Sequence, residues 1–218
     1  MCGIVGYMDL RGEGRIDRKI LVRMTDTITY QGPDSSGYFA VHNVGLGFRR
    51  LSVVDVVSKD QPIYNEDGSI VLICNAEIHN CLELKQELIH LGHTFTTNSA
   101  VEVLLHLYEE EGEEFVKQLN GQFAFALFDR KKSTMLLARD HSGINPLFYT
   151  VVDGFFIFAS EMKAILAHPA VISPRTVFRG VSSLKAGHRI TVNRERVAVE
   201  EYWDYMPPAE VSLSHSIS

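Results

Sequence analysis

The order of strands and helices along this 218-residue chain predicts an α+β fold, in which two sheets pack face to face with helices outside. Short strands are expected in both halves of the sequence, and two amphipathic helices follow one another in the middle. Asn/Gly and Asp/Gly turns separate many of the strands, which favours antiparallel neighbours. A hydrophobic content of 45% and a charged content of 22% are ordinary for one compact domain.

The first part of the chain is predicted to contain one helix between strands. Residues 17–29 carry four apolar side chains at helical spacing, which indicates an amphipathic helix. The segment YQGPDSSG at 30–37 is dense in turn formers and predicts a loop. Strands are expected, in order, at residues 5–9, 38–42, 45–55 and 69–78.

The middle of the chain predicts two consecutive helices. Asn80 precedes an apolar helical face and resembles a helix cap, and Gly92 is expected to end that helix. Ser99 and Glu102 form an S-x-x-E start signal for the second helix. This signal places Ala100 in the first turn of the second helix.

The second half of the chain returns to strands and then ends in a polar tail. The tail after Trp203 is rich in Pro and Ser and has no apolar period, so we expect a folded domain over 1–206 and a linker over 207–218. A short helix is expected at 161–169. Further strands are expected at 121–129, 134–140, 146–153, 155–160, 187–193 and 196–203.

Charge and hydropathy argue against two classes of function. The chain has 21 Lys and Arg against 27 Asp and Glu, a net charge of −6, and no basic stripe. Binding to nucleic acid or to an anionic membrane therefore has little electrostatic support. Its apolar runs are shorter than the roughly 18 residues that a membrane helix needs. We expect no membrane association and a cytoplasmic location.

The cysteines and histidines do not predict a metal site or disulfides. Three cysteines without paired spacing are typical of a reducing compartment. Cys74 and Cys81 are expected to be small buried residues. His90 and His93 lack partner ligands at useful spacing, so no metal is expected.

Cys2 is the residue that suggests chemistry. A free thiol, with a pKa of about 8.5, is mostly protonated at neutral pH and needs a base to act as a nucleophile. If Met1 is removed, Cys2 gains its own α-amino group, whose reference pKa of about 7.7–8.0 suits proton exchange near pH 7. The chain terminus is therefore a candidate nucleophile with an internal base.

An ordered set of motifs then identifies a family. MCGIVG, QGPDSSG, RRLSVVD, QPIYNEDGSIVLICNAEIHN, LNGQFAFALFD and ARDHSGINPLFY stand in the order expected of one domain. Over roughly residues 1–204 the chain resembles the glutaminase domain of glutamine-dependent asparagine synthetase, a class II, N-terminal-nucleophile glutamine amidotransferase. The resemblance implies a four-layer αββα sandwich of two antiparallel sheets with outer helices, the N-terminal-nucleophile hydrolase fold.

The resemblance also implies roles for individual residues. Cys2 would attack the side-chain amide of glutamine and release ammonia, and Asn75 with Ala76 would form the oxyanion hole. Arg50 would hold the substrate α-carboxylate through its guanidinium group. The implied substrate pocket comprises Arg50, Leu51, Val53, Val54, Asn75, Ala76, Glu77 and Ala100.

Three departures from the family pattern leave alternatives open. Tyr30-Gln31 replaces the His-Arg of the family. Ala76 replaces a glycine, and the methyl group of Ala76 would be unfavourable if this position required a positive φ. Ala100 replaces the aspartate that receives the α-ammonium of glutamine, which predicts weakened glutamine binding. A non-catalytic glutaminase-like scaffold and a hydrolase of a different amide are therefore the alternatives.

The chain contains no SGGxDS-like pyrophosphatase loop. ATP and Mg are therefore expected only in a separate synthetase domain, in cis or in trans, toward which residues 207–218 would lead. No cofactor is expected in this chain. The expected partners are glutamine or a related amide and that synthetase domain, with a homodimer as a possibility.

Overall fold

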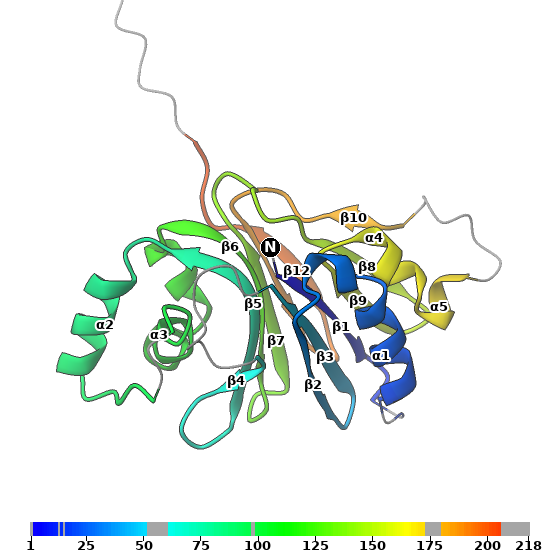
Figure 1. Ribbon diagram of the computed structural model, residues 1–218, viewed down its shortest axis with the longest axis horizontal. Helices are drawn as coiled ribbons and strands as arrows, with labels where there is room; N and C mark the ends of the chain where they lie inside the picture. The colour runs from blue at the N-terminus through cyan, green and yellow to red at the C-terminus, as the bar shows by residue number, and fades with distance from the viewer. Residues whose placement is uncertain are drawn as a thin grey trace, which may run out of the picture.

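The computed structural model describes residues 2–12, 14, 16–51, 61–96, 99–172 and 180–205. Two six-stranded sheets lie face to face, and helices cover the outer face of each (Figure 1). All strand pairs are antiparallel. The predicted four-layer αββα sandwich of two antiparallel sheets with outer helices is confirmed.

The first sheet carries the N-terminal strand near its centre. Its order across the sheet is β10 (Ser182–Ser183), β8 (Phe148–Val152), β9 (Phe155–Ala159), β1 (Gly3–Asp9), β3 (Val44–Arg50) and β2 (Ser35–Val41). Strand β2 begins within the segment that the sequence predicted as a loop, because Ser35 and Ser36 pair with the end of β3.

The second sheet is built from the middle and the end of the chain. Its order is β12 (Val197–Glu201), β11 (His188–Val192), β7 (Thr134–Arg139), β6 (Gly121–Asp129), β5 (Ile70–Ile78) and β4 (Ile63–Tyr64). Strand β4 is only two residues long, so most of one edge of β5 extends beyond it.

Alternating side chains fill the space between the sheets. Ile4 and Met8 of β1 face Val71 and Ile73 of β5 in a fully buried apolar cluster. Period-two alternation sends the intervening residues of each strand to the outer face, where helices cover them. Burial on both faces explains why β1 and β5 read as nearly continuous apolar runs.

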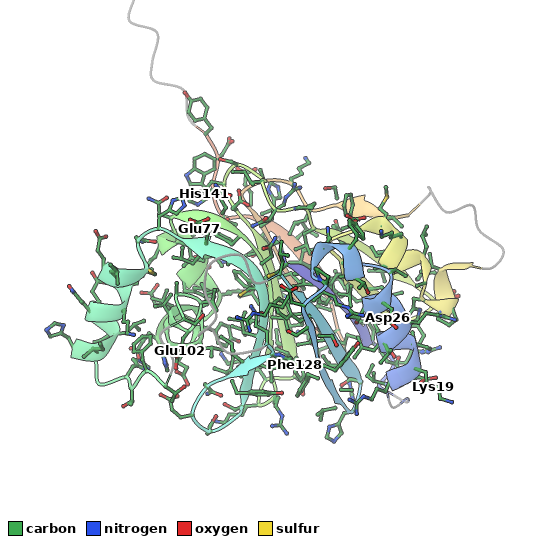
Figure 2. All side chains as sticks on the ribbon, in the orientation of Figure 1. Lys19, Asp26, Glu77, Glu102, Phe128 and His141 are labelled. Carbon is green, nitrogen blue, oxygen red and sulfur yellow. The ribbon has the colours of Figure 1, made fainter. Side chains whose placement is uncertain are left out.

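The helices form the two outer layers. The first sheet is covered by α1 (Arg18–Asp26), α4 (Met162–Leu166) and α5 (Pro169–Ile172), and the second by α2 (Cys81–His90) and α3 (Val103–Glu111) (Figure 1). Two short 3₁₀ helices are also described, η1 (Thr29–Gln31) and η2 (Gly112–Gln118). Asp26 of α1 and Glu102 beside α3 mark these opposite layers (Figure 2). No helix in the described ranges is long and apolar enough to cross a membrane.

One of the two predicted helix starts in the middle of the chain is confirmed, and the other differs in detail. Helix α3 begins at Val103, and Ala100 lies in the preceding turn. In this turn Glu102 accepts hydrogen bonds from Thr96 N (2.7 Å) and Thr96 Oγ1 (2.9 Å). Helix α2 begins directly after Asn80, as predicted, but the Asn80 side chain makes no capping hydrogen bond. Its side chain instead bonds the backbone of Gln118 and Asn120, in a segment distant in sequence.

Candidate active site

Cys2 lies at the start of β1, beside the end of β3. Gly3 pairs with Arg49, so the next pair in this register brings Cys2 opposite Arg50. Cys2 is partly buried and packs against the apolar cluster between the sheets. The start of β1 thus lies at one end of the sandwich, where the first sheet faces the second (Figure 1).

Asn75 approaches Cys2 from the opposite sheet. Val71 and Ile73 face the space between the sheets, and alternation places Asn75 on the same face of β5. The backbone nitrogen of Cys2 donates a hydrogen bond to Asn75 Oδ1 over 3.3 Å, although the residues are 73 positions apart. The sheet-on-sheet packing therefore brings together two of the residues implied by the sequence.

Asn145 fixes the amide of Asn75. Asn75 Nδ2 donates to Asn145 Oδ1 at 2.9 Å, and Asn145 Nδ2 donates back to the Asn75 carbonyl at 3.1 Å. Asp140, fully buried, accepts from the backbone nitrogens of Asn145 (3.3 Å) and Ile144 (3.1 Å). This reciprocal pair holds the Asn75 side chain in one orientation, with one amide hydrogen not used by Asn145.

Ala76 occupies regular strand geometry. It lies within β5 opposite Phe123 and does not adopt a positive φ, so its methyl group meets no backbone strain. The side chain of Gln61 bonds both the nitrogen (2.5 Å) and the carbonyl (3.0 Å) of Cys74. Because backbone groups two residues apart point to the same side of a strand, the Ala76 N–H points to this edge of β5, away from β6.

The two arginines at the end of β3 face different layers. Arg49 bonds the end of α1, through the carboxylate of Asp26 and the carbonyl of Thr25. Arg50 follows Phe48 by two positions, and Phe48 packs between the sheets, so Arg50 shares the inner face with Cys2. The fold thus gives the side chains of these two neighbouring arginines different surroundings.

The other two cysteines pack into the apolar cluster beneath the helices of the second sheet. Burial chiefly, and the nearby Cys2 next, raise the pKa of the Cys74 thiol far above its usual range, although a hydrogen bond with Gln61 lowers it. Cys74 is 1% exposed, as the sequence predicted. Cys81 is half-buried and packs against the cluster beneath α2.

Gln31 lies against the start of β1. Its Nε2 donates to Glu161 Oε1 at 2.8 Å, and Tyr30 bonds the same carboxylate oxygen. A Cβ placed on Gly3 would lie 2.7 Å from Gln31 Oε1 and would clash with it. Gln31 Oε1 is buried without a hydrogen-bond partner among the described residues. The Gln31 side chain thus packs directly behind the segment that carries Cys2.

The remaining predicted pocket residues are less closely tied to Cys2. Leu51 is half-buried directly after β3, and Val53 and Val54 lie outside the described residues. Glu77 is exposed near the end of β5 (Figure 2). Ala100 is exposed, and no described hydrogen bond or ion pair connects it with Cys2, Arg50 or Asn75.

Sequence reasoning missed Asn145 and Gln61, whose partners on β5 lie 70 and 13 positions away, because no local pattern links them to that strand. It also missed a group of Glu66, His93 and His106, whose ligand atoms lie within 4.8 Å of one another and could hold a metal ion. Only His93 had been considered, as a neighbour of His90. The loop motif around Asn145 was noted in the sequence, but nothing in it indicated a bond to Asn75.

Comparison with known proteins gives a consistent result. The family model for a glutamine amidotransferase domain matches residues 1–203. Asparagine synthetase [glutamine-hydrolyzing] 3 of Bacillus subtilis is 37% identical over 94% of this chain, and asparagine synthetase 2 of the same organism is 46% identical over 78%. The chain spans 37% and 23% of the lengths of these relatives.

Solved structures share the fold at low sequence identity. Glutamine phosphoribosylpyrophosphate amidotransferase from B. subtilis, complexed with ADP and GMP, superposes with a TM-score of 0.75 at 19% identity. A structure described as the allosteric regulatory enzyme of purine biosynthesis gives 0.78 at 19% identity. Each match covers 94% of this chain and 50% of the other.

Proposed function

This chain belongs to the glutamine amidotransferase family, and from that premise we propose that it hydrolyses the side-chain amide of glutamine to glutamate and ammonia. The observation that carries the proposal is the 3.3 Å hydrogen bond from the Cys2 nitrogen to Asn75 Oδ1. It joins the candidate nucleophile and the candidate oxyanion donor across the two sheets. The proposal requires removal of Met1, so that the Cys2 nitrogen becomes an amine.

In the proposed first step, the Cys2 amine takes the thiol proton and Sγ attacks the amide carbon. The amine then passes this proton to the departing nitrogen, and ammonia leaves. A glutamyl thioester remains on Cys2. Water hydrolyses the thioester to glutamate and restores the thiol, with the same amine acting as the base.

The proposed oxyanion hole consists of a side chain and a backbone group. Asn75 Nδ2 uses one hydrogen on Asn145, so its second hydrogen is available for the developing oxyanion. The Ala76 N–H points to the edge of β5 away from β6 and supplies the second donor. This role is compatible with alanine in place of glycine, because Ala76 does not adopt a positive φ and its methyl group therefore causes no backbone strain.

Substrate selectivity is the weakest part of the glutamine assignment. Arg50, on the inner face beside Cys2, is proposed to bind the α-carboxylate of the substrate. Ala100 offers no acceptor for an α-ammonium group. A hydrogen bond to a charged group contributes about 1.5–3 kcal/mol, so we propose glutamine binding weaker by roughly ten- to a hundred-fold than with an aspartate there. The same observation favours the second candidate, hydrolysis of an amide that lacks an α-ammonium.

The ammonia is proposed to pass to a synthetase domain. The relatives are named as glutamine-hydrolysing asparagine synthetases, and this chain matches only a fraction of their length. We therefore propose that the chain supplies ammonia to an asparagine-synthetase-like partner, in cis or in trans.

The test is an assay of glutamate and ammonia release from glutamine, beside asparagine and des-amino analogues of glutamine. Glutaminase activity that disappears in Cys2→Ala supports the proposal. Turnover of a des-amino amide in preference to glutamine moves the assignment to the second candidate. A correctly processed, folded chain that hydrolyses none of these amides contradicts both and leaves a scaffold role.

A further inference from the structure

A cluster of histidine and glutamate side chains lies where the α2–α3 connection meets α3. The His–Glu cluster comprises Glu66 from the β4–β5 turn, His93 from the segment after α2, and His106 and Glu109 from α3. These residues belong to three separate segments, so only the fold brings them together. None of them has a part in the proposed amide hydrolysis.

Glu109 is the centre of the His–Glu cluster. Its Oε2 lies 2.9 Å from His106 Nδ1 and 3.7 Å from His93 Nδ1. Glu66 Oε1 lies 3.8 Å from His106 Nδ1. Asn65 Nδ2 donates to the other oxygen of Glu109 at 2.8 Å, which fixes the direction of the carboxylate. Such outer hydrogen bonds are typical of carboxylates that bind metals.

The two imidazoles are packed together and mostly shielded from water. Their ring centroids are 4.7 Å apart, and Phe95 packs edge-on against His106 at 4.7 Å. His106 is 1% exposed, and its Nε2 has no hydrogen-bond partner among the described residues. Its described polar contacts are therefore made through Nδ1, the nitrogen that faces the carboxylates.

The charge of the His–Glu cluster favours a cation. Glu110 adds a third carboxylate, 2.8 Å from His93 Nε2. Within the described part of the chain, no Lys or Arg forms an ion pair with Glu66, Glu109 or Glu110. Neutral imidazoles would leave three negative charges together around a partly buried centre. A divalent cation would neutralise most of that charge.

We propose that the His–Glu cluster binds one zinc ion. Two imidazole nitrogens and carboxylate oxygens are a donor set that suits zinc, at about 2.0–2.2 Å from the metal. Donors around tetrahedral zinc are therefore roughly 3.3 Å apart. The histidine and Glu66 donor atoms already lie within 4.8 Å of one another, and the Glu66 side chain, 46% exposed, has room to move inward.

Zinc at this position would connect three segments of the chain. It would tie the β4–β5 turn and the α2–α3 connection to α3. Ala100, in the turn before α3, lies on the same connection. The zinc site is thus proposed to have a structural role, independent of whether the chain hydrolyses glutamine.

The test measures zinc binding in a Cys2→Ala chain without an affinity tag, because a terminal cysteine with its amine can itself chelate zinc. We expect one zinc per chain after dialysis and a rise in Tm with added zinc. His93→Ala should weaken zinc binding by at least about ten-fold and abolish the rise in Tm. His90→Ala is the matched control, since His90 is an exposed histidine on α2 outside the His–Glu cluster, and should bind as the parent does.

Two further measurements guard against indirect effects. Glu66→Gln preserves the shape of a half-exposed side chain and should also weaken zinc binding while the circular dichroism spectrum stays unchanged. Cobalt should bind in place of zinc without a sulfur-to-metal charge-transfer band, because no cysteine is a proposed ligand. The proposal is overturned if the parent retains no zinc, if His93→Ala and Glu66→Gln bind as tightly as His90→Ala, or if the cobalt spectrum shows thiolate ligation.

Discussion

Individual residues at the candidate site owe their roles to the face of the strand on which they lie. Cys74 and Asn75 are neighbours in β5, yet Cys74 is buried beneath the outer helices while Asn75 faces Cys2. Arg49 and Arg50 differ in the same way, since Arg49 bonds the end of α1. Period-two alternation therefore places neighbouring side chains of one motif on opposite faces of the sheet, one toward the helices and one toward the candidate site.

The cysteines provide the first prediction. Cys2→Ala should abolish amide hydrolysis with little change in stability, because Cys2 is a partly buried terminal residue. Cys74→Ala should retain activity but lower the free energy of unfolding by about 1–2 kcal/mol, because it leaves a small cavity. Turnover assays and urea unfolding of both variants separate the two effects. Wild-type turnover in Cys2→Ala would exclude the proposed nucleophile.

The second prediction concerns Ala100. Ala100→Asp should tighten glutamine binding by roughly ten-fold or more, because a charge-assisted contact to the α-ammonium is regained. Ala100 itself is exposed, and an anion near a helix N-terminus is stabilised by about 0.3–1 kcal/mol, so folding should tolerate the change. The KM for glutamine and calorimetric binding check it. Unchanged or weaker affinity would show that the site does not receive an α-ammonium group at this position.

The third prediction concerns Asn145 as a positioning residue. Asn145→Ala removes both hydrogen bonds that orient Asn75, so kcat for amide hydrolysis should fall by about ten-fold or more, with a smaller change in KM. Asn193→Ala, in the turn between β11 and β12, is the control and should leave kcat unchanged. Equal kcat values in the two variants, at equal stability, would refute the positioning role.

At the scale of elements, packing against a sheet decides what the local signals mean. Asn80 stands where a helix cap is expected, but it bonds the backbone of Gln118 and Asn120. Glu102 holds Thr96 in the preceding segment, and α3 begins one residue later. Each side chain thus bonds a group outside its own helix, which local helix signals do not predict.

The packing of α5 against the first sheet gives the fourth prediction. His168 is 2% exposed, contacts Tyr7 at a ring distance of 4.7 Å, and accepts from Ala170 N at 3.2 Å. Burial chiefly, and the nearby Arg23 next, lower the pKa of His168 from 6.5 to about 4. Between these two values the unfolded chain binds a proton that the folded chain does not. Stability should therefore fall as the pH drops through this window, by about 2 kcal/mol at pH 5 from this group alone.

The measurement is urea unfolding at pH 7 and pH 5 for the native chain and for His168→Gln, which cannot titrate. The variant should lose less stability between the two pH values than the native chain does. Tyr7 does not interfere, because burial raises its pKa to about 12. The same loss in both proteins would show that His168 is not the responsible group.

For the whole molecule, the apolar cluster between the sheets determines where the site residues meet. Cys2 is held by the first sheet and Asn75 by the second, and they approach each other only because the two sheets pack at this spacing. The site thus depends on the distance between the layers as well as on its own residues.

The fifth prediction tests this dependence. Ile73→Ala, at a fully buried position between the sheets, should cost about 2–5 kcal/mol of stability and also lower kcat, because the neighbouring Asn75 loses support. Val151→Ala, at a 50% exposed position on β8, should change stability by no more than about 0.5 kcal/mol and leave kcat unaltered. Thermal unfolding and turnover of the two variants check this. Similar losses in both would mean that the sheet-to-sheet packing is not the controlling contact.

The sequence by itself determined most of the longer strands and helices, the α+β class, the terminal cysteine as candidate nucleophile and the family resemblance. These follow from local periodicity, turn chemistry and the order of motifs along the chain. Only the tertiary structure decided that Asn145 orients Asn75, that Ala76 lies in unstrained strand geometry, and that His93 meets His106 and Glu66. The physical reason is that most of these features depend on residues from different strands and helices. Whether such residues meet depends on how the strands pair and the helices pack, and local sequence patterns do not encode this.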